Sequence, residues 1–192
     1  MGYDKDKVMS IPLTKEKYIL YILNHLPPEK SDKFYLNKIA FLIEFAYLYF
    51  HEKPLSSADY AAITYGPVIN DYKLTLDEMQ KKKLIKVEGN NIRVLTTEPV
   101  KVSEEISTFS IPLIQKYSNL SMGELTAITH KTDSYKISTH GGVAMGADID
   151  KSLAALETFF DESINSEAEI PESSLPSFDR KNLVKYDFGR RV

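Results

Sequence analysis

The sequence predicts a mainly α-helical fold: a compact helical domain with one central buried helix and one small β-hairpin. Residues 39 to 50 are apolar nearly all round, which is typical of a helix with neighbours on several sides. Apolar residues recur at helical spacing through most of the remaining chain. Two β-branched runs flank the tight-turn sequence Gly89-Asn90-Asn91, and this order indicates a hairpin.

The composition narrows the class of protein. A chain of 192 residues fits one domain, and 43% hydrophobic with 27% charged residues is ordinary for a globular protein. The formal net charge of -3 argues against a strongly basic nucleic-acid binder. The chain has no cysteine, so disulfides, thiolate catalysis and Cys-based zinc sites are excluded. We expect no cofactor and no metal.

The apolar stretches are too short for a membrane span. The longest one, residues 39 to 50, is interrupted by Glu44, whereas a spanning helix needs about 20 apolar residues. The first ten residues are charged and show no secretory signal. We therefore expect a cytoplasmic protein without membrane contact.

The first half of the chain contains two well-marked helices. Thr14 can cap a helix that runs to about residue 25, where a Pro-Pro pair stops it. Ser31 or Asp32 can cap the central helix, which runs to about residue 51. Glu44 interrupts its apolar surface, and we expect this carboxylate to be paired or to point to a rim.

A more broken region follows. A serine at position 56 or 57 can cap a short helix through Ile63, which the turn at Gly66-Pro67 ends. A further helix fits residues 69 to 83. The hairpin then comprises residues 85 to 87 and 92 to 95.

The second half has three expected helices. Ser103 can start one that Pro112 should bend or restart. Ser121 and Glu124 have the spacing of a capping box, at the head of a helix that runs to about residue 130. A last helix is expected at residues 150 to 163.

Three regions of the chain differ in character. We divide it into an N-terminal arm (residues 1–13), one domain (14–164) and a C-terminal linker and tail (165–192). The end of the tail is basic and interleaved with apolar residues, among them Tyr186 and Phe188. A solvated end needs no such residues, so the segment either docks on the acidic side of its own domain or orders on a partner. We expect the second, with a disordered end as the competing interpretation.

A basic cluster precedes and enters the hairpin. A helix with lysines followed by a hairpin resembles a winged helix-turn-helix, in which these side chains would contact phosphates. A solvated helix face is the competing interpretation. The cluster comprises Lys81, Lys82, Lys83, Lys86 and Arg93.

The histidines offer no metal site. None of the four has the compact spacing of metal ligands. His130 lies at the end of an expected helix, where an imidazolium can meet the negative end of the helix dipole. The chain also contains no catalytic motif, so we expect no enzyme.

The order of features from Tyr35 onwards resembles the SocA-like antitoxin family, whose domain is called Panacea. A Leu-x-Lys-apolar helix (Leu36 to Ile39) is followed by an acidic residue, a Lys-Pro-Leu break and an aromatic-Gly-Pro-Val turn. A later segment resembles the family's second signature and includes Thr129 and His130. This chain departs from the family in having no tryptophan, and Tyr135 stands near that place.

The resemblance implies an antitoxin that binds and blocks a protein toxin by direct contact, without catalysis. It also implies a possible second role as an adaptor that delivers the toxin to a Clp-type protease. The alternative is a winged-helix DNA-binding regulator of its own operon or of a mobile element. The expected partner-binding residues are Tyr60, Tyr65, Gly66, Pro67, Val68, Glu44, His130 and Tyr135, with Tyr186 and Phe188 in the tail.

The residue types of the turn Tyr65-Gly66-Pro67 also have a physical interpretation that does not depend on the resemblance. Pro67 fixes its own φ and excludes the helical region for Gly66. Gly66 permits the close approach of a neighbouring segment. Tyr65 can pack over that neighbour, with its hydroxyl toward a polar group or a partner.

Overall fold

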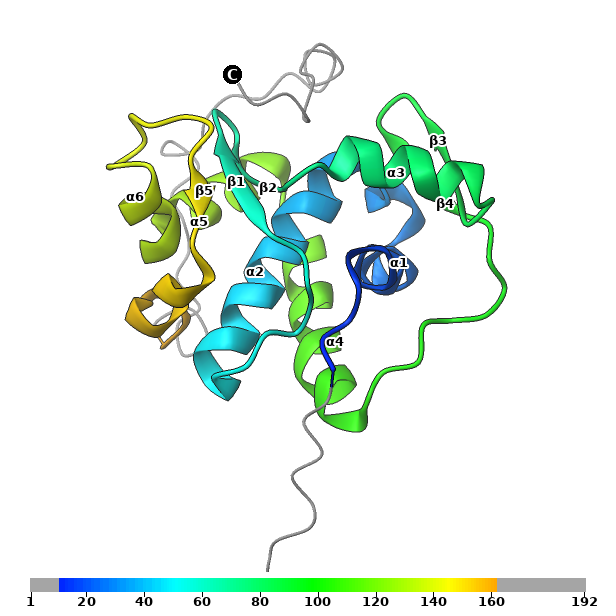
Figure 1. Cartoon of the computed structure of the whole chain (residues 1–192), viewed down its shortest axis with the longest axis horizontal. Coiled ribbons are helices and arrows are strands. Elements are labelled where there is room, and N and C mark those ends of the chain that lie inside the picture. The colour runs from blue at the N-terminus through cyan, green and yellow to red at the C-terminus, as the bar shows by residue number, and fades with distance from the viewer. Residues whose placement is uncertain (1–10, 162–192) are drawn as a thin grey trace, which may run out of the picture.

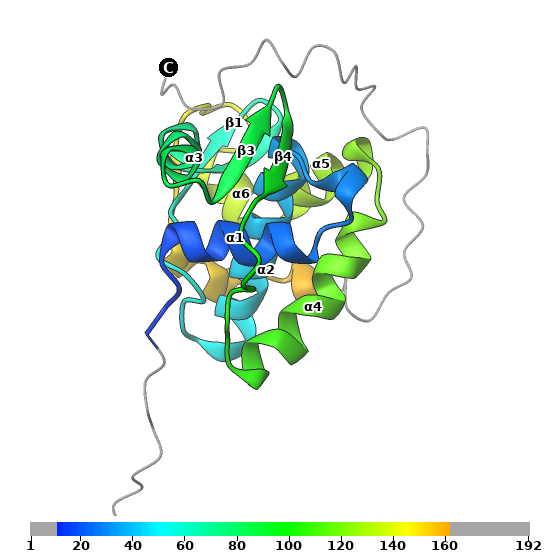
Figure 2. The same cartoon turned by 90° about the vertical axis from the view of Figure 1, so that its right-hand side faces the viewer.

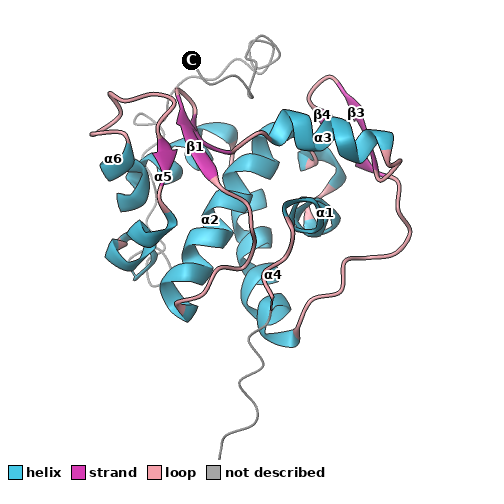
Figure 3. Ribbon diagram, viewed as in Figure 1, coloured by secondary structure: helices cyan, strands magenta, loops and turns pink. Residues whose placement is uncertain are grey.

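The computed structural model describes residues 11–161 and is mainly helical, with two small antiparallel sheets (Figures 1 and 3). The elements, in chain order, are α1 (Lys15–His25), the 3-10 helix η1 (Pro28–Lys30), α2 (Lys33–His51), β1 (Tyr60–Ile63), β2 (Gly66–Ile69), α3 (Tyr72–Lys81), β3 (Ile85–Glu88), β4 (Asn91–Val94), α4 (Glu104–Ser118), α5 (Met122–Lys131), α6 (Asp133–Ser138), β5 (Asp148–Ile149) and the 3-10 helix η2 (Lys151–Leu156).

Helix α2 is the central element, as the apolar sequence predicted (Figure 1). Asp32 caps it by accepting a hydrogen bond of 2.8 Å from the amide of Tyr35. Every residue from Phe34 to Tyr47 is buried, against α1, α4, α5, β2 and η2. Two buried tyrosines, Tyr18 and Tyr60, donate to the same carbonyl of Ala40 at 2.7 and 3.0 Å. The core is therefore organised around one helix.

Several predicted caps are confirmed. The side chain of Thr14 accepts from the amide of Lys17, and that of Ser103 from the amide of Ile106. Ser121 and Glu124 form the reciprocal capping box of α5. The hairpin β3–β4 is also confirmed, with Glu88 paired to Asn91 across its turn. Figure 2 shows this hairpin beside α1.

The short helix predicted through Ile63 is wrong, because the segment is strand β1. It pairs antiparallel with β2 across the turn Thr64-Tyr65, and with β5 on its other edge, in the order β2-β1-β5. The tight turn thus precedes Gly66-Pro67, which begin β2. Strand pairing of residue 60 with residue 149 is a long-range contact that no local pattern encodes.

Two helix starts and one predicted break within a helix also differ from expectation. The helix predicted at residues 69 to 83 starts only at Tyr72, because Ile69 is paired in β2 and Asp71 has a φ of 55°. Helix α4 continues through Pro112, so the predicted restart there is wrong. The helix predicted at residues 150 to 163 begins instead as the 3-10 helix η2.

Segment 146–161, which we call the C-terminal strap, fastens onto the domain through two buried carboxylates. Lys151 Nζ lies 2.9 Å from Glu44 Oε1 and 2.8 Å from the carbonyl oxygen of Ser56. Burial raises the pKa of Glu44, and Lys151 opposes that shift. Glu157 accepts from the amides of Asp133 and Ser134 at the start of α6. The expectation that Glu44 is paired is confirmed.

Candidate functional site

The tip of the β1–β2 hairpin meets the end of α5, α6 and the loop that follows α6 (Figure 1). Both segments that carried the family resemblance therefore converge here: the Gly-Pro-Val turn and the Thr-His pair. The first strand of the hairpin is held by β5, and the second by α2.

Gly66 is required at the start of β2 by both conformation and space. Its φ is 99°, a value that residues with a Cβ atom rarely adopt. A Cβ at this position would lie 2.9 Å from Thr129 Oγ1, 3.0 Å from Lys38 Nζ and 3.3 Å from His130 Cδ2. The predicted close approach of a neighbour is confirmed, and the neighbours are α2 and α5.

Lys38 lies beneath this turn and is 1% exposed. Its Nζ donates to the carbonyl oxygen of Pro67 at 3.0 Å, and no carboxylate of residues 11–161 forms an ion pair with it. Burial lowers the pKa of Lys38 well below its ordinary value. The preceding residue, Asn37, accepts from the amide of Ile69 at 2.8 Å. Two successive side chains of α2 thus hold strand β2 in place.

His130 and Tyr135 form one side of the site. Their rings are stacked at 4.6 Å between centroids with an angle of 6°. The hydroxyl of Tyr135 donates to the carbonyl of Ile63 at 3.2 Å, which ties α6 to the hairpin. Tyr135 is 2% exposed, so its ring has a structural role between α6 and the hairpin.

His130 is neutral near pH 7. Desolvation and the neighbouring Lys38 lower the pKa of His130 to about 4. The expected imidazolium at the helix end is therefore wrong, because burial and a nearby cation outweigh the helix dipole. His130 Nε2 is buried and has no hydrogen-bond partner among the described residues.

A pocket of about 270 Å3 opens between these elements. Its lining combines the stacked pair with the hairpin tip and the loop after α6: Thr64, His130, Tyr135, Lys136, Gly141, Gly142 and Met145. Large apolar side chains are exposed on α6 and its following loop: Ile137 at 46%, Val143 at 83% and Met145 at 40%. The arrangement offers aromatic walls, a thioether and a single ammonium group to a partner.

The other expected site residues differ in burial, and two of them lie outside the described range. Tyr60, Val68 and Glu44 are buried, and Tyr60 and Glu44 bond within the core. Tyr65 is half-buried at the hairpin turn. Tyr186 and Phe188 lie outside the described residues.

Sequence reasoning missed two parts of the site. Lys38 was read as a family position without a role, although a lysine inside an apolar helix was itself a signal of a buried amine. The loop with Gly141-Gly142 was assigned no role from the sequence, although it lines the pocket. Its approach to the hairpin is set by β5, which the sequence did not reveal.

The basic cluster lies at the other end of the molecule, on α3 and the β3–β4 hairpin (Figure 1). Lys82 pairs with Glu16 at 2.6 Å, and Lys86 pairs with Glu88 at 2.5 Å. A helix followed by a hairpin is present, as in a winged helix-turn-helix. However, Lys82 and Lys86 already form ion pairs, and phosphate contacts would need these cations to be free. The winged-helix comparison remains a prediction.

Two negative findings apply to residues 11–161. No helix there is long and apolar enough to cross a membrane. No group of three or more histidine or acidic side chains within that range could hold a metal ion.

Comparison with known proteins gives the family. Comparisons with curated proteins and with solved structures found no match. A comparison with protein families matched residues 36–135, more than half of the chain, to the family described as "Antitoxin SocA-like, Panacea domain". This segment begins in α2 and ends at Tyr135, so it includes the hairpin, Lys38 and the stacked pair. The chain belongs to the SocA-like antitoxin family and contains its Panacea domain.

Proposed function

We propose that this protein is an antitoxin that binds a cognate protein toxin and neutralises it by direct contact. The family gives the general role. One observation supports the location: the two family segments meet at a single pocket beside exposed apolar side chains. Protein interfaces concentrate their affinity in such pockets, surrounded by a polar rim.

The pocket suits an inserted side chain better than a cofactor. Its volume of about 270 Å3 lies below the roughly 300 to 1,000 Å3 of small-molecule sites. The flat rings of His130 and Tyr135 favour an aromatic or apolar side chain of the toxin. Lys136, whose side chain is 51% exposed, can meet an acceptor at the rim. Inhibition is then steric and needs no catalysis by this chain.

The adaptor role is a further part of this proposal. An antitoxin that also delivers its toxin to a Clp-type protease would act in the cytoplasm and would need a second surface. The support for this part is the family alone. The DNA-binding alternative has less support, because Lys82 and Lys86 are engaged in ion pairs.

The test uses the product of the neighbouring gene as the candidate toxin. Co-expression should rescue growth, and the two chains should co-elute in size-exclusion chromatography. Val143→Asp should weaken binding by roughly tenfold or more, because it desolvates a carboxylate without a partner.

The matched control is Leu74→Asp. Leu74 is also an exposed apolar residue, at 59%, but it lies on α3 away from the pocket. Equal effects of the two substitutions on affinity would remove the pocket from the proposal, and no rescue with no complex would remove the antitoxin role for that pair.

A further inference from the structure

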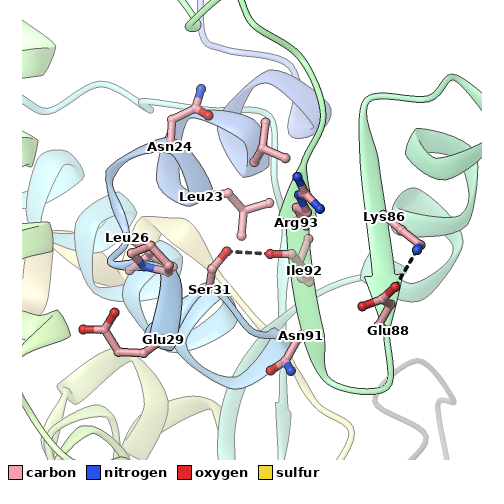
Figure 4. A pocket seen from close by; sticks show the side chains of 12 residues that line it. Leu23, Asn24, Leu26, Glu29, Ser31, Lys86, Glu88, Asn91, Ile92 and Arg93 are labelled. Atoms are coloured by element: carbon pink, nitrogen blue, oxygen red, sulfur yellow. Dashed lines mark hydrogen bonds and ion pairs between the residues drawn. The ribbon is translucent and has the colours of Figure 1, made fainter.

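A second groove in the described part of the chain lies apart from the candidate site. It measures about 810 Å3 and runs between the end of α1 with η1 on one side and the β3–β4 hairpin on the other (Figure 4). Leu23, Leu26 and Ile92 form its apolar floor. Polar side chains stand along both walls.

Strand β4 presents a partly unpaired edge to this groove. The hairpin register pairs Ile85 with Val94. The hydrogen bond from Leu95 N to Leu84 O shows which residues of β4 bond to β3 through their main chain, and these alternate along the strand. That alternation turns the main-chain groups of Ile92 and Val94 outward. Ser31 bonds to both main-chain groups of Ile92. The carbonyl of Ser31 accepts from Ile92 N at 2.8 Å, and the hydroxyl of Ser31 donates to Ile92 O at 2.7 Å (Figure 4). The N–H and C=O of Val94 have no partner among residues 11–161.

The charged side chains of the groove are also partly unpaired. Lys86 is neutralised by Glu88 on β3 (Figure 4). Arg93 on β4 and Glu29 on η1 form no ion pair or hydrogen bond within the described residues. A cation and an anion therefore line opposite walls of the groove.

We propose that this groove binds a short extended peptide segment of another protein, which adds to the edge of β4. One residue of the peptide pairs through its main chain with Val94 N and O, as in strand addition to a sheet edge. An acidic side chain of the peptide pairs with Arg93, and a basic side chain reaches Glu29. An apolar side chain lies over the floor of Leu23 and Ile92.

A peptide fits this surface better than a nucleic acid. The Val94 carbonyl requires a donor, and a phosphate backbone has none to offer. Glu29 would also repel phosphates in the same groove. The proposal is independent of the antitoxin role, because the groove shares no lining residue with the pocket at His130.

The experiment begins with a selection of random 12-residue displayed peptides on the full chain, followed by synthesis of the enriched sequence. We expect an acidic residue next to apolar ones in that sequence. Arg93→Glu should weaken its binding in calorimetry by about tenfold or more, because a charge-assisted pair is lost and a repulsion gained. Exchanging the acidic residue of the peptide for lysine should restore binding to Arg93→Glu.

A second measurement tests the main-chain pairing without a substitution. Bound peptide should slow hydrogen exchange of the Val94 amide and leave the amide of Arg93, already paired within the hairpin, little changed. Lys101→Glu, the same charge change outside the groove lining, is the control and should bind the peptide normally.

Three results would overturn the proposal. The first is a selection that enriches no sequence. The second is an enriched peptide whose affinity is unaffected by Arg93→Glu and whose binding leaves Val94 exchange unchanged. The third is Arg93-dependent binding of a random DNA duplex with no peptide binding, which would assign the surface to nucleic acid.

Discussion

Lys38 and Gly66 show how single residues shape the site. Burying the amine of Lys38 without a carboxylate partner is costly, yet its Nζ lies 3.0 Å from where a Cβ at Gly66 would stand and donates to the carbonyl of Pro67. The turn is thereby fixed from below by α2. On its outer side, Thr64 is exposed and Tyr65 is half-buried.

Gly66→Ala should destabilise the fold by roughly 2 to 5 kcal/mol, the sum of backbone strain and overpacking. Gly142→Ala is the matched control, because Gly142 has nearly the same φ, 96° against 99°, but nothing within 4 Å of its Cβ position. Urea unfolding measures both. If the two variants lose the same stability, the contacts with Thr129 and Lys38 contribute nothing and conformation alone explains the glycine.

Lys38→Met should change how stability depends on pH. The pKa of Lys38 is lowered in the folded state, so the unfolded chain binds more protons below its ordinary value of about 10.5, and folding carries a penalty there. Relative to the wild type, Lys38→Met should therefore gain stability as pH falls from 10 to 7. Denaturation at several pH values measures the difference, and a constant difference would mean that Lys38 does not change protonation on folding.

At the scale of elements, the C-terminal strap fastens the three-stranded sheet and one wall of the pocket. Strand β5 pairs with β1, Lys151 reaches Glu44 in α2, and Glu157 caps α6. Each contact joins the strap to a different element. The pocket loop, which lies between α6 and β5, is thus held at both of its ends.

Lys151→Met should cost about 3 kcal/mol at pH 7.5, because it leaves the carboxylate of Glu44 buried and unpaired. Burial already raises the pKa of Glu44, and loss of Lys151 raises it further. A raised pKa adds stability at low pH and loses it as pH rises, so the variant should be less impaired at pH 5. The double variant Glu44→Gln with Lys151→Met should recover much of the loss, and no recovery would show that Lys151 acts through Ser56 or packing instead.

At the scale of the whole molecule, the family segment and the rest of the chain contribute different parts. The matched residues 36–135 supply α2, the hairpin and the stacked rings. The pocket is completed by Lys136, Gly141, Gly142 and Met145, which lie beyond that segment. The pocket therefore combines residues inside the matched segment with residues that follow it.

The C-terminal tail is expected to add affinity for the toxin. Residues 180–192 are basic and contain apolar residues, among them Tyr186 and Phe188. Truncation after Pro176 should weaken toxin binding in calorimetry more than about threefold and reduce growth rescue, because the tail adds contacts to the interface. A smaller loss of affinity would leave the tail without this role. Loss of thermal stability in the truncated chain would point instead to contact with its own domain.

The sequence alone determined the elements whose signals are local. The central helix follows from a long apolar run with Asp32 at its head, and the capping box follows from Ser121 and Glu124. The hairpin at residues 85 to 94 follows from the tight-turn sequence Gly89-Asn90-Asn91 between two β-branched runs. The family resemblance, also read from ordered local segments, named the hairpin turn and His130.

The tertiary structure decided what depends on segments far apart in the chain. Tyr60 is part of a strand because it pairs with Ile69 and Ile149. The four residues of β1 are too few for their local sequence to favour helix or strand. His130 is neutral because folding buries it beside Lys38, which lies in another helix. The pocket exists only where β5 brings the loop after α6 to the hairpin. Local propensity cannot encode these contacts, because their energy arises from burial and pairing between elements.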